Sequence, residues 1–80
     1  MPDEEILHAL GGRIRDLRLE QGLSQERLAE LSCIHENHLR RVELGQVNPT
    51  ILVLFRIGEA LQVSVDDIIS AVSPRRQRSR

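Results

Sequence analysis

The chain has 80 residues, 40% of them hydrophobic and 29% charged, and its formal net charge is −1. A chain of this length forms one small domain that buries only about 60–65% of its unfolded surface, which excludes several domains and argues against a deep catalytic cleft. No apolar run reaches the ~18 residues of a membrane span, the N-terminus is acidic where a signal peptide is basic, and the single cysteine allows no internal disulfide, so we expect a cytoplasmic protein.

The first predicted helix covers residues 4–20, where apolar side chains recur every three or four positions. Asp3 is the expected N-cap, and Gly22 provides a stop after the last turn. Gly11 and Gly12 lie in the middle of this segment, so we expect the helix to be weakened or kinked there.

Four shorter helices follow. Ser24 caps a helix over residues 25–31, and a tight turn at 32–34 leads to a helix over 36–44. Thr50 and Ser64 are the expected caps of the last two, over residues 51–62 and from about 65 to 72. No alternating strand pattern is found, so the expected architecture is all-α, with a domain over residues 1–73 and a disordered basic tail over 74–80.

Residues 24–45 have the pattern of a helix-turn-helix. Ala29 is small where the two helices must approach closely, and Ile34 fills the turn. Leu39 and Val42 fix the second helix to the core, which leaves its polar residues facing outward: Glu36, Asn37, Arg40 and Arg41.

Three stretches carry a resemblance to a known family: LGGRIRDLRLEQGLSQERLAE (10–30), HLRRVELGQVNPT (38–50) and IGEALQVSVDDII (57–69). With them the chain resembles the XRE-type helix-turn-helix family, the Cro and lambda-repressor-like DNA-binding domains. The resemblance implies a compact five-helix lambda-repressor-like domain that regulates transcription and binds a palindromic operator in double-stranded DNA as a homodimer. We expect no enzyme, because no Ser/His/Asp or Cys/His arrangement is supported by a cleft-forming architecture and no phosphate-binding glycine loop is found. LAELSCI and the short tail are most similar to small controller-type regulators of restriction–modification genes.

The resemblance also assigns roles to side chains. It places base contacts at Glu36, Asn37 and Arg41, although for Glu36 a solvated helix face is an equally good interpretation. The residues expected to contact phosphate are Arg13, Gln25, His35, His38, Arg40, Gln46 and Asn48. The resemblance implies that Gln25 also supports the second helix of the motif. Arg18 and Glu43 are expected to form a partly buried ion pair that fixes the angle of the second helix of the motif.

Cys33 stands where the family usually has glycine, which suggests a left-handed backbone at this turn. Cys33, His35 and His38 could also be read as a metal site, but a fourth ligand is missing, so we expect no metal and no cofactor.

Apolar residues on the last two helices exceed what one small core needs. Phe55, Val65 and Ile69 are the expected dimer contacts, with closure of the monomer core as the alternative. We expect no small-molecule effector, because the chain leaves no room for a separate ligand domain.

Charge is the main objection to DNA binding. Residues 1–73 hold seven arginines and 12 acidic residues, a formal charge of −5. The expectation is that Arg13, Arg40 and Arg41 fall on one side, with the acidic groups elsewhere. The alternative function is a protein-interaction module, such as the antitoxin-like partner in a toxin–antitoxin pair.

Overall fold

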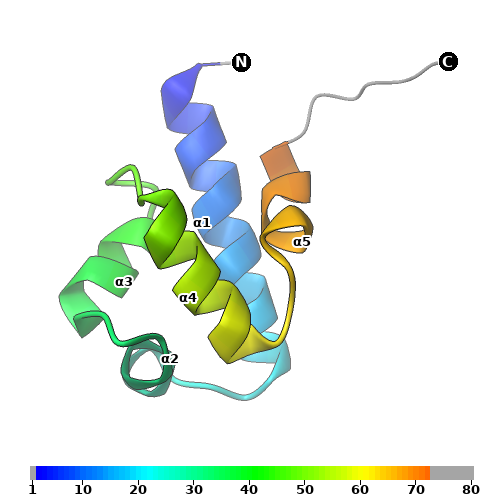
Figure 1. Cartoon of the computed structure of the whole chain (residues 1–80). Coiled ribbons are helices and arrows are strands. Elements are labelled where there is room, and N and C mark those ends of the chain that lie inside the picture. Colours follow the sequence, from blue (N-terminus) through cyan, green and yellow to red (C-terminus); the bar gives the residue numbers. More distant parts are fainter. Residues whose placement is uncertain (1, 73–80) are drawn as a thin grey trace, which may run out of the picture.

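The computed structural model describes residues 2–72. Over this part of the chain the elements are five α-helices followed by a short 3-10 turn (Figure 1): α1 (Asp3–Glu20), α2 (Gln25–Ser32), α3 (Glu36–Glu43), α4 (Ile51–Leu61), α5 (Val65–Ile69) and η1 (Ser70–Val72). The all-α five-helix prediction is confirmed for the described residues, and the last predicted helix proves to be one α-helical turn that tightens into η1. The predicted tail over 74–80 lies outside the described residues.

The helix starts follow from local hydrogen bonds. The hydroxyls of Ser24 and Thr50 accept the backbone N–H groups of Arg27 and Val53, at 3.0 and 3.1 Å. At α5 the bonds are reciprocal: Ser64 Oγ accepts the N–H of Asp67, and the Asp67 carboxylate accepts the N–H of Ser64. Each cap satisfies a donor that the first helical turn leaves without a partner.

The start of α1 differs from the prediction. Asp3 is the first helical residue instead of the N-cap, because Pro2 takes the cap position and its carbonyl accepts the N–H of Ile6 at 3.1 Å. Asp3 still lies in the first turn, where the positive end of the helix dipole favours a carboxylate.

Gly11 is needed for packing and does not kink α1, which runs unbroken from Asp3 to Glu20. A Cβ added at Gly11 would lie 2.2 Å from the carbonyl oxygen of Val42, whereas one added at Gly12 would meet nothing within 4 Å. The absence of a side chain at Gly11 therefore lets α3 lie directly against α1.

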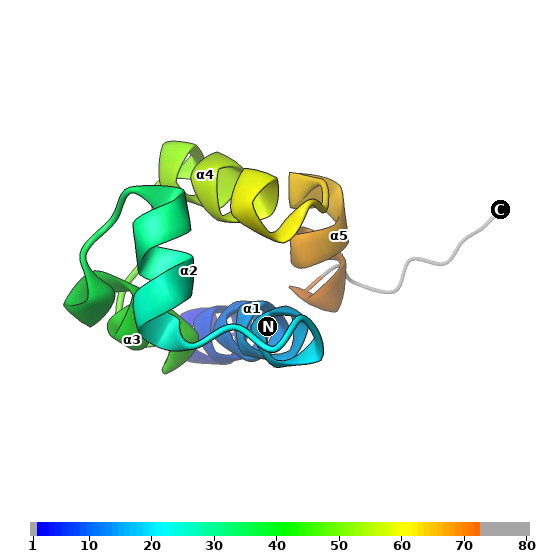
Figure 2. The same ribbon diagram turned by 90° about the horizontal axis from the view of Figure 1, so that it is seen from below.

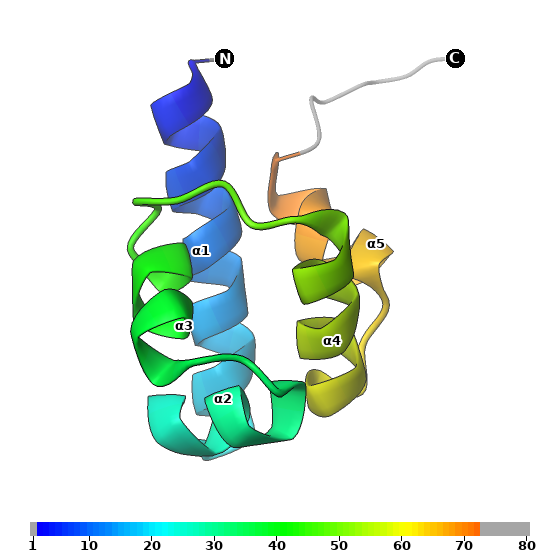
Figure 3. The ribbon, with the colours of Figure 1, turned by 60° about the vertical axis from the view of Figure 1, so that its left-hand side comes forward.

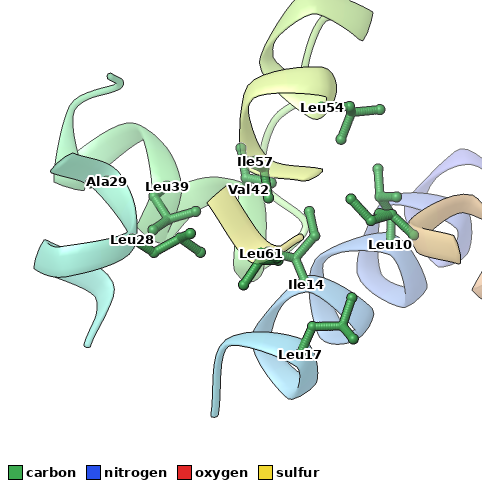
Figure 4. Close-up of a cluster of buried hydrophobic side chains, with 11 residues drawn as sticks. Leu10, Ile14, Leu17, Leu28, Ala29, Leu39, Val42, Leu54, Ile57 and Leu61 are labelled. Carbon is green, nitrogen blue, oxygen red and sulfur yellow. The ribbon is translucent and has the colours of Figure 1, made fainter. Parts of the chain in front are cut away.

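The core is entirely aliphatic (Figure 4). Every α-helix contributes to it, and the buried apolar residues are Leu10, Ile14, Leu17, Leu28, Ala29, Leu39, Val42, Leu54, Ile57, Leu61 and Ile68. Figure 2 shows α2 and α3 at one side of the molecule and α5 at the other, with α1 and α4 between them.

Candidate nucleic-acid interface

The turn between α2 and α3 depends on a left-handed residue. Cys33 has φ 59° and ψ 41°, and it is followed by Ile34, whose N–H donates to the carbonyl of Ala29 at 3.0 Å. This is the geometry that usually calls for glycine at the end of a helix. It reverses the chain within a few residues, so that α2 lies below α3 (Figure 3).

The sides of α3 are sharply divided. Leu39 and Val42 are buried at 0% and 1% exposure, while Glu36, Asn37, Arg40 and Arg41 are exposed. The residues for which base contact was predicted thus lie on the outer face of the helix. They occupy consecutive turns, at the spacing with which a helix presents side chains to one groove.

A network of hydrogen bonds connects three of these outward residues. Arg40 donates through Nη1 to the Asn37 side-chain oxygen at 2.6 Å and through Nη2 to the Glu36 carboxylate at 3.1 Å. Arg41 makes no side-chain hydrogen bond or ion pair within residues 2–72. Its guanidinium is therefore available for an external ligand.

On the buried side of α3, the helix is held by a cluster of hydrogen-bonded polar side chains around Glu43. Arg18 meets the Glu43 carboxylate with two donors, Nε to Oε2 at 2.7 Å and Nη2 to Oε1 at 3.0 Å, and its Nη1 donates to the carbonyl of Leu23 at 2.9 Å. Gln25 completes the cluster by donating Nε2 to Glu43 Oε1 at 2.9 Å. The Glu43 carboxylate therefore joins the end of α3 to α1 and to the start of α2.

The Arg18–Glu43 pair was expected from the resemblance, and so was support of α3 by Gln25, although Glu43 was not identified as the acceptor. Gln25 occupies the first position of α2, where a long polar side chain can reach a neighbouring helix. Since one N–H of the Gln25 amide is held by Glu43, the side chain is fixed at the N-terminus of α2, where anions bind favourably.

The remaining residues predicted to contact phosphate are scattered around α3. His35 is exposed at the N-cap position and makes no side-chain cap bond, and His38 is half-buried one turn later. Gln46 and Asn48 are exposed in the loop after α3. Asn48 borders a hollow of about 380 Å³ against the first turns of α1.

Arg13 does not belong to this group. Its Nε donates to the carbonyl of Asp67 in α5 at 3.2 Å, on the flank of α1 away from Gly11 and therefore away from α3. The expectation that Arg13, Arg40 and Arg41 fall on one side is not met. Helical periodicity shows which face of α1 is buried, but not which helix covers each flank.

A second exposed surface lies on α4. Phe55 is 56% exposed, and Ile51 and Leu52, which the sequence analysis did not select, are 58% and 56% exposed. A Cβ at Gly58 would meet the backbone of Val63 and Val65, so that flank of α4 faces α5. Phe55 and Ile51 lie three and seven residues before Gly58 and extend the same flank.

The two other predicted dimer residues, Val65 and Ile69, are only partly buried on α5. The name α4–α5 surface is used below for five exposed or partly buried apolar residues of these two helices: Ile51, Leu52, Phe55, Val65 and Ile69.

Residues 2–72 contain no group of three His, Cys, Asp or Glu side chains that could hold a metal ion, and Cys33 is an exposed free thiol. Among the same residues no helix is both long and apolar enough to span a membrane.

Comparisons with known proteins agree with this geometry. Residues 14–68 match the family model HTH_3, described as helix-turn-helix. The chain is 33% identical over 61 residues to an uncharacterized HTH-type transcriptional regulator, y4dJ, of Sinorhizobium fredii, covering 76% of this chain and 79% of the relative. It is 33% identical over 75 residues to the control protein C.SmaI of Serratia marcescens, covering 88% and 89%.

Among solved structures, the restriction-modification controller protein C.AhdI from Aeromonas hydrophila superposes with a TM-score of 0.77 at 35% sequence identity. The superposition covers 78% of this chain and 94% of that one. The similarity therefore extends over most of the length of each of these three proteins.

Proposed function

Since the chain belongs to the helix-turn-helix family of DNA-binding transcriptional regulators, we propose that it binds a palindromic operator as a homodimer and reads it with α3. The observation that carries this proposal is that α3 has one side fixed in the protein and one exposed polar side. On its buried side, Glu43 is held by hydrogen bonds from Arg18 and Gln25. On its outer side, Asn37 and Arg41 are exposed to solvent. A helix held in this way can enter the major groove at one fixed angle.

Each exposed side chain suits a particular contact. Arg41 can fork onto the O6 and N7 of guanine, Asn37 can bind a purine edge, and Glu36 can accept from the amino group of cytosine. Gln25, Gln46 and Asn48 are proposed to meet phosphates on either side of the groove. We do not assign this role to Arg13, because its guanidinium is engaged with α5.

The α4–α5 surface is the proposed dimer contact. Of its two helices, α5 lies at the opposite side of the molecule from α2 and α3, and α4 lies between the two sides (Figure 2). Two copies joined chiefly through α5 would each leave α3 free. A two-fold axis through this contact would place two α3 helices about 34 Å apart, one turn of the duplex.

Two relatives favour a more specific role. One is called a control protein and the other a restriction-modification controller, and each aligns along most of its own length. We therefore propose that the operator lies beside restriction–modification genes. Footprinting of the DNA upstream of this chain's own gene should then reveal a protected inverted repeat.

The general experiment is selection of bound duplexes from a random library. We expect enrichment of an inverted repeat whose half-sites are centred roughly ten base pairs apart. The variant with both Asn37→Ala and Arg41→Ala should lose the preference, while Arg56→Gln, which changes an exposed arginine on α4, should retain it. Absence of any preferred duplex for the wild-type chain would contradict the proposal, and a co-purifying protein partner would then support the antitoxin-like alternative.

The net acidic charge predicts weak dependence on salt. A domain with few cations at the DNA surface releases few counterions when it binds, so the logarithm of affinity should fall less steeply with the logarithm of salt concentration than for a strongly basic repressor.

A further inference from the structure

Arg40 donates hydrogen bonds to two neighbouring side chains on the exposed face of α3, those of Asn37 and Glu36. Its guanidinium reaches back along α3 and holds the Asn37 side-chain oxygen at 2.6 Å and the Glu36 carboxylate at 3.1 Å. A planar guanidinium can hold two acceptors at fixed positions in this way, whereas an ammonium group has no such fork. The two residues that it holds are two of the three proposed to contact bases.

The first turn of α3 has few other restraints. His35 occupies the N-cap position but makes no side-chain bond to the helix, in contrast to Ser24, Thr50 and Ser64 at the starts of α2, α4 and α5. An uncapped first turn frays more readily. Glu36 and Asn37 lie in that turn, so the bonds from Arg40 are the side-chain contacts that restrain them.

The network also fixes what Asn37 can offer. Because its oxygen faces Arg40, its amide nitrogen is directed away from the guanidinium, with two N–H donors available. Such an arrangement suits an acceptor on a base edge, such as the N7 of a purine.

The same network also neutralises the negative charge of Glu36. A lone carboxylate on the recognition face would repel DNA phosphates, but the guanidinium of Arg40 pairs with it. Side chains of both partners are almost half exposed, at 45% for Arg40 and 44% for Glu36, so the pair lies on the surface that would meet DNA.

We propose that Arg40 is a positioning residue for sequence readout, orienting Asn37 and neutralising Glu36, instead of the phosphate ligand that the sequence analysis expected. This inference rests on the proposed function. Under this inference, loss of Arg40 changes which bases the protein prefers. Loss of a phosphate ligand would instead weaken binding to all sequences about equally.

The decisive variant is Arg40→Lys, which keeps the positive charge and removes the fork. We expect its affinity for random duplex and its salt dependence to remain within about twofold of wild type, because the charge that sets nonspecific binding is kept. Discrimination at the base pair read by Asn37 should fall about 10-fold, at the lower end of what a specific base-edge contact contributes. Preserved discrimination in Arg40→Lys would overturn the inference.

A charge-matched double variant, Glu36→Gln with Arg40→Gln, gives a second test because its net charge equals that of wild type. Loss of a phosphate ligand would lower the salt slope by about one, and that result would also contradict the inference. We expect an unchanged slope with relaxed base preference. If wild-type protein itself shows no preferred duplex, the proposed function fails first, which separates the two outcomes.

Discussion

At the residue scale, Arg18 and Glu43 are the two charged residues that are buried in the described part of the chain. The side chains of Arg18 and Glu43 are 9% and 2% exposed, and every oxygen of the carboxylate has a donor. A buried pair of this kind adds little net stability over an apolar pair, but either partner is costly when left alone.

We therefore expect Arg18→Met to destabilise the domain by about 3–5 kcal/mol, because Glu43 would remain as an uncompensated buried charge. Denaturant unfolding followed by circular dichroism measures the change. The surface pair Arg27–Glu30, whose side chains are 58% and 61% exposed, is the control, and Arg27→Met should change stability by less than about 1 kcal/mol. Equal losses from the two variants would refute this account of Arg18.

Cys33 lets the cost of a left-handed residue be measured in isolation. It is exposed, so a change there removes no core contact. We expect Cys33→Gly to stabilise the domain by up to about 1 kcal/mol, since glycine adopts this conformation without the Cβ penalty. Cys33→Ser keeps the penalty and should leave the unfolding midpoint unchanged; a glycine variant no more stable than the serine variant would show that the turn is unstrained.

At the scale of the elements, we predict opposite changes in stability when each of two adjacent glycines in α1 is replaced by alanine. Gly11→Ala should destabilise by about 1–3 kcal/mol or more, because its Cβ would collide with the backbone of α3. Gly12→Ala faces open space and should stabilise by about 0.5–1 kcal/mol through helix propensity alone. Thermal unfolding of both variants checks the pair, and a tolerated alanine at position 11 would mean that α1 and α3 are not held this closely.

The elements themselves were predictable because their signals are local. Ser24, Thr50 and Ser64 mark helix starts through bonds to residues three positions ahead, and the predicted bounds differ from the observed ones by one or two residues at most for α1 to α4. Apolar spacing likewise identified the buried side of α3.

What the sequence could not provide is the arrangement between helices. Gly11 was read as a weak point, because nothing in its neighbours reveals that α3 lies against it. Arg13 was expected on the same side as Arg40 and Arg41, because the sequence does not show that its guanidinium contacts α5. The bond between Gln25 and Glu43 likewise spans helices that only the tertiary fold brings together. The outward face of α3 was predicted correctly, while the contacts that Arg40 makes across it depend on side-chain conformation.

At the scale of the whole molecule, α3, which would read DNA, and α5 lie at opposite sides, with α4 between them (Figure 2). We predict that Phe55→Asp and Ile69→Asp each shift the protein from dimer to monomer in sedimentation, because a buried charge opposes an apolar interface. Leu19→Asp is the matched control, since Leu19 is 50% exposed on α1, outside that surface. If both α4–α5 variants sediment as dimers, the interface lies elsewhere.

An aliphatic core leaves the molecule nearly without a chromophore. The chain has no Trp and no Tyr, and its one aromatic ring, Phe55, stands on the surface proposed for self-association. A tryptophan introduced at position 55 would thus be the sole fluorophore, carried by a helix face that no core residue occupies. Its emission maximum would report directly on assembly, moving to longer wavelength as the protein is diluted.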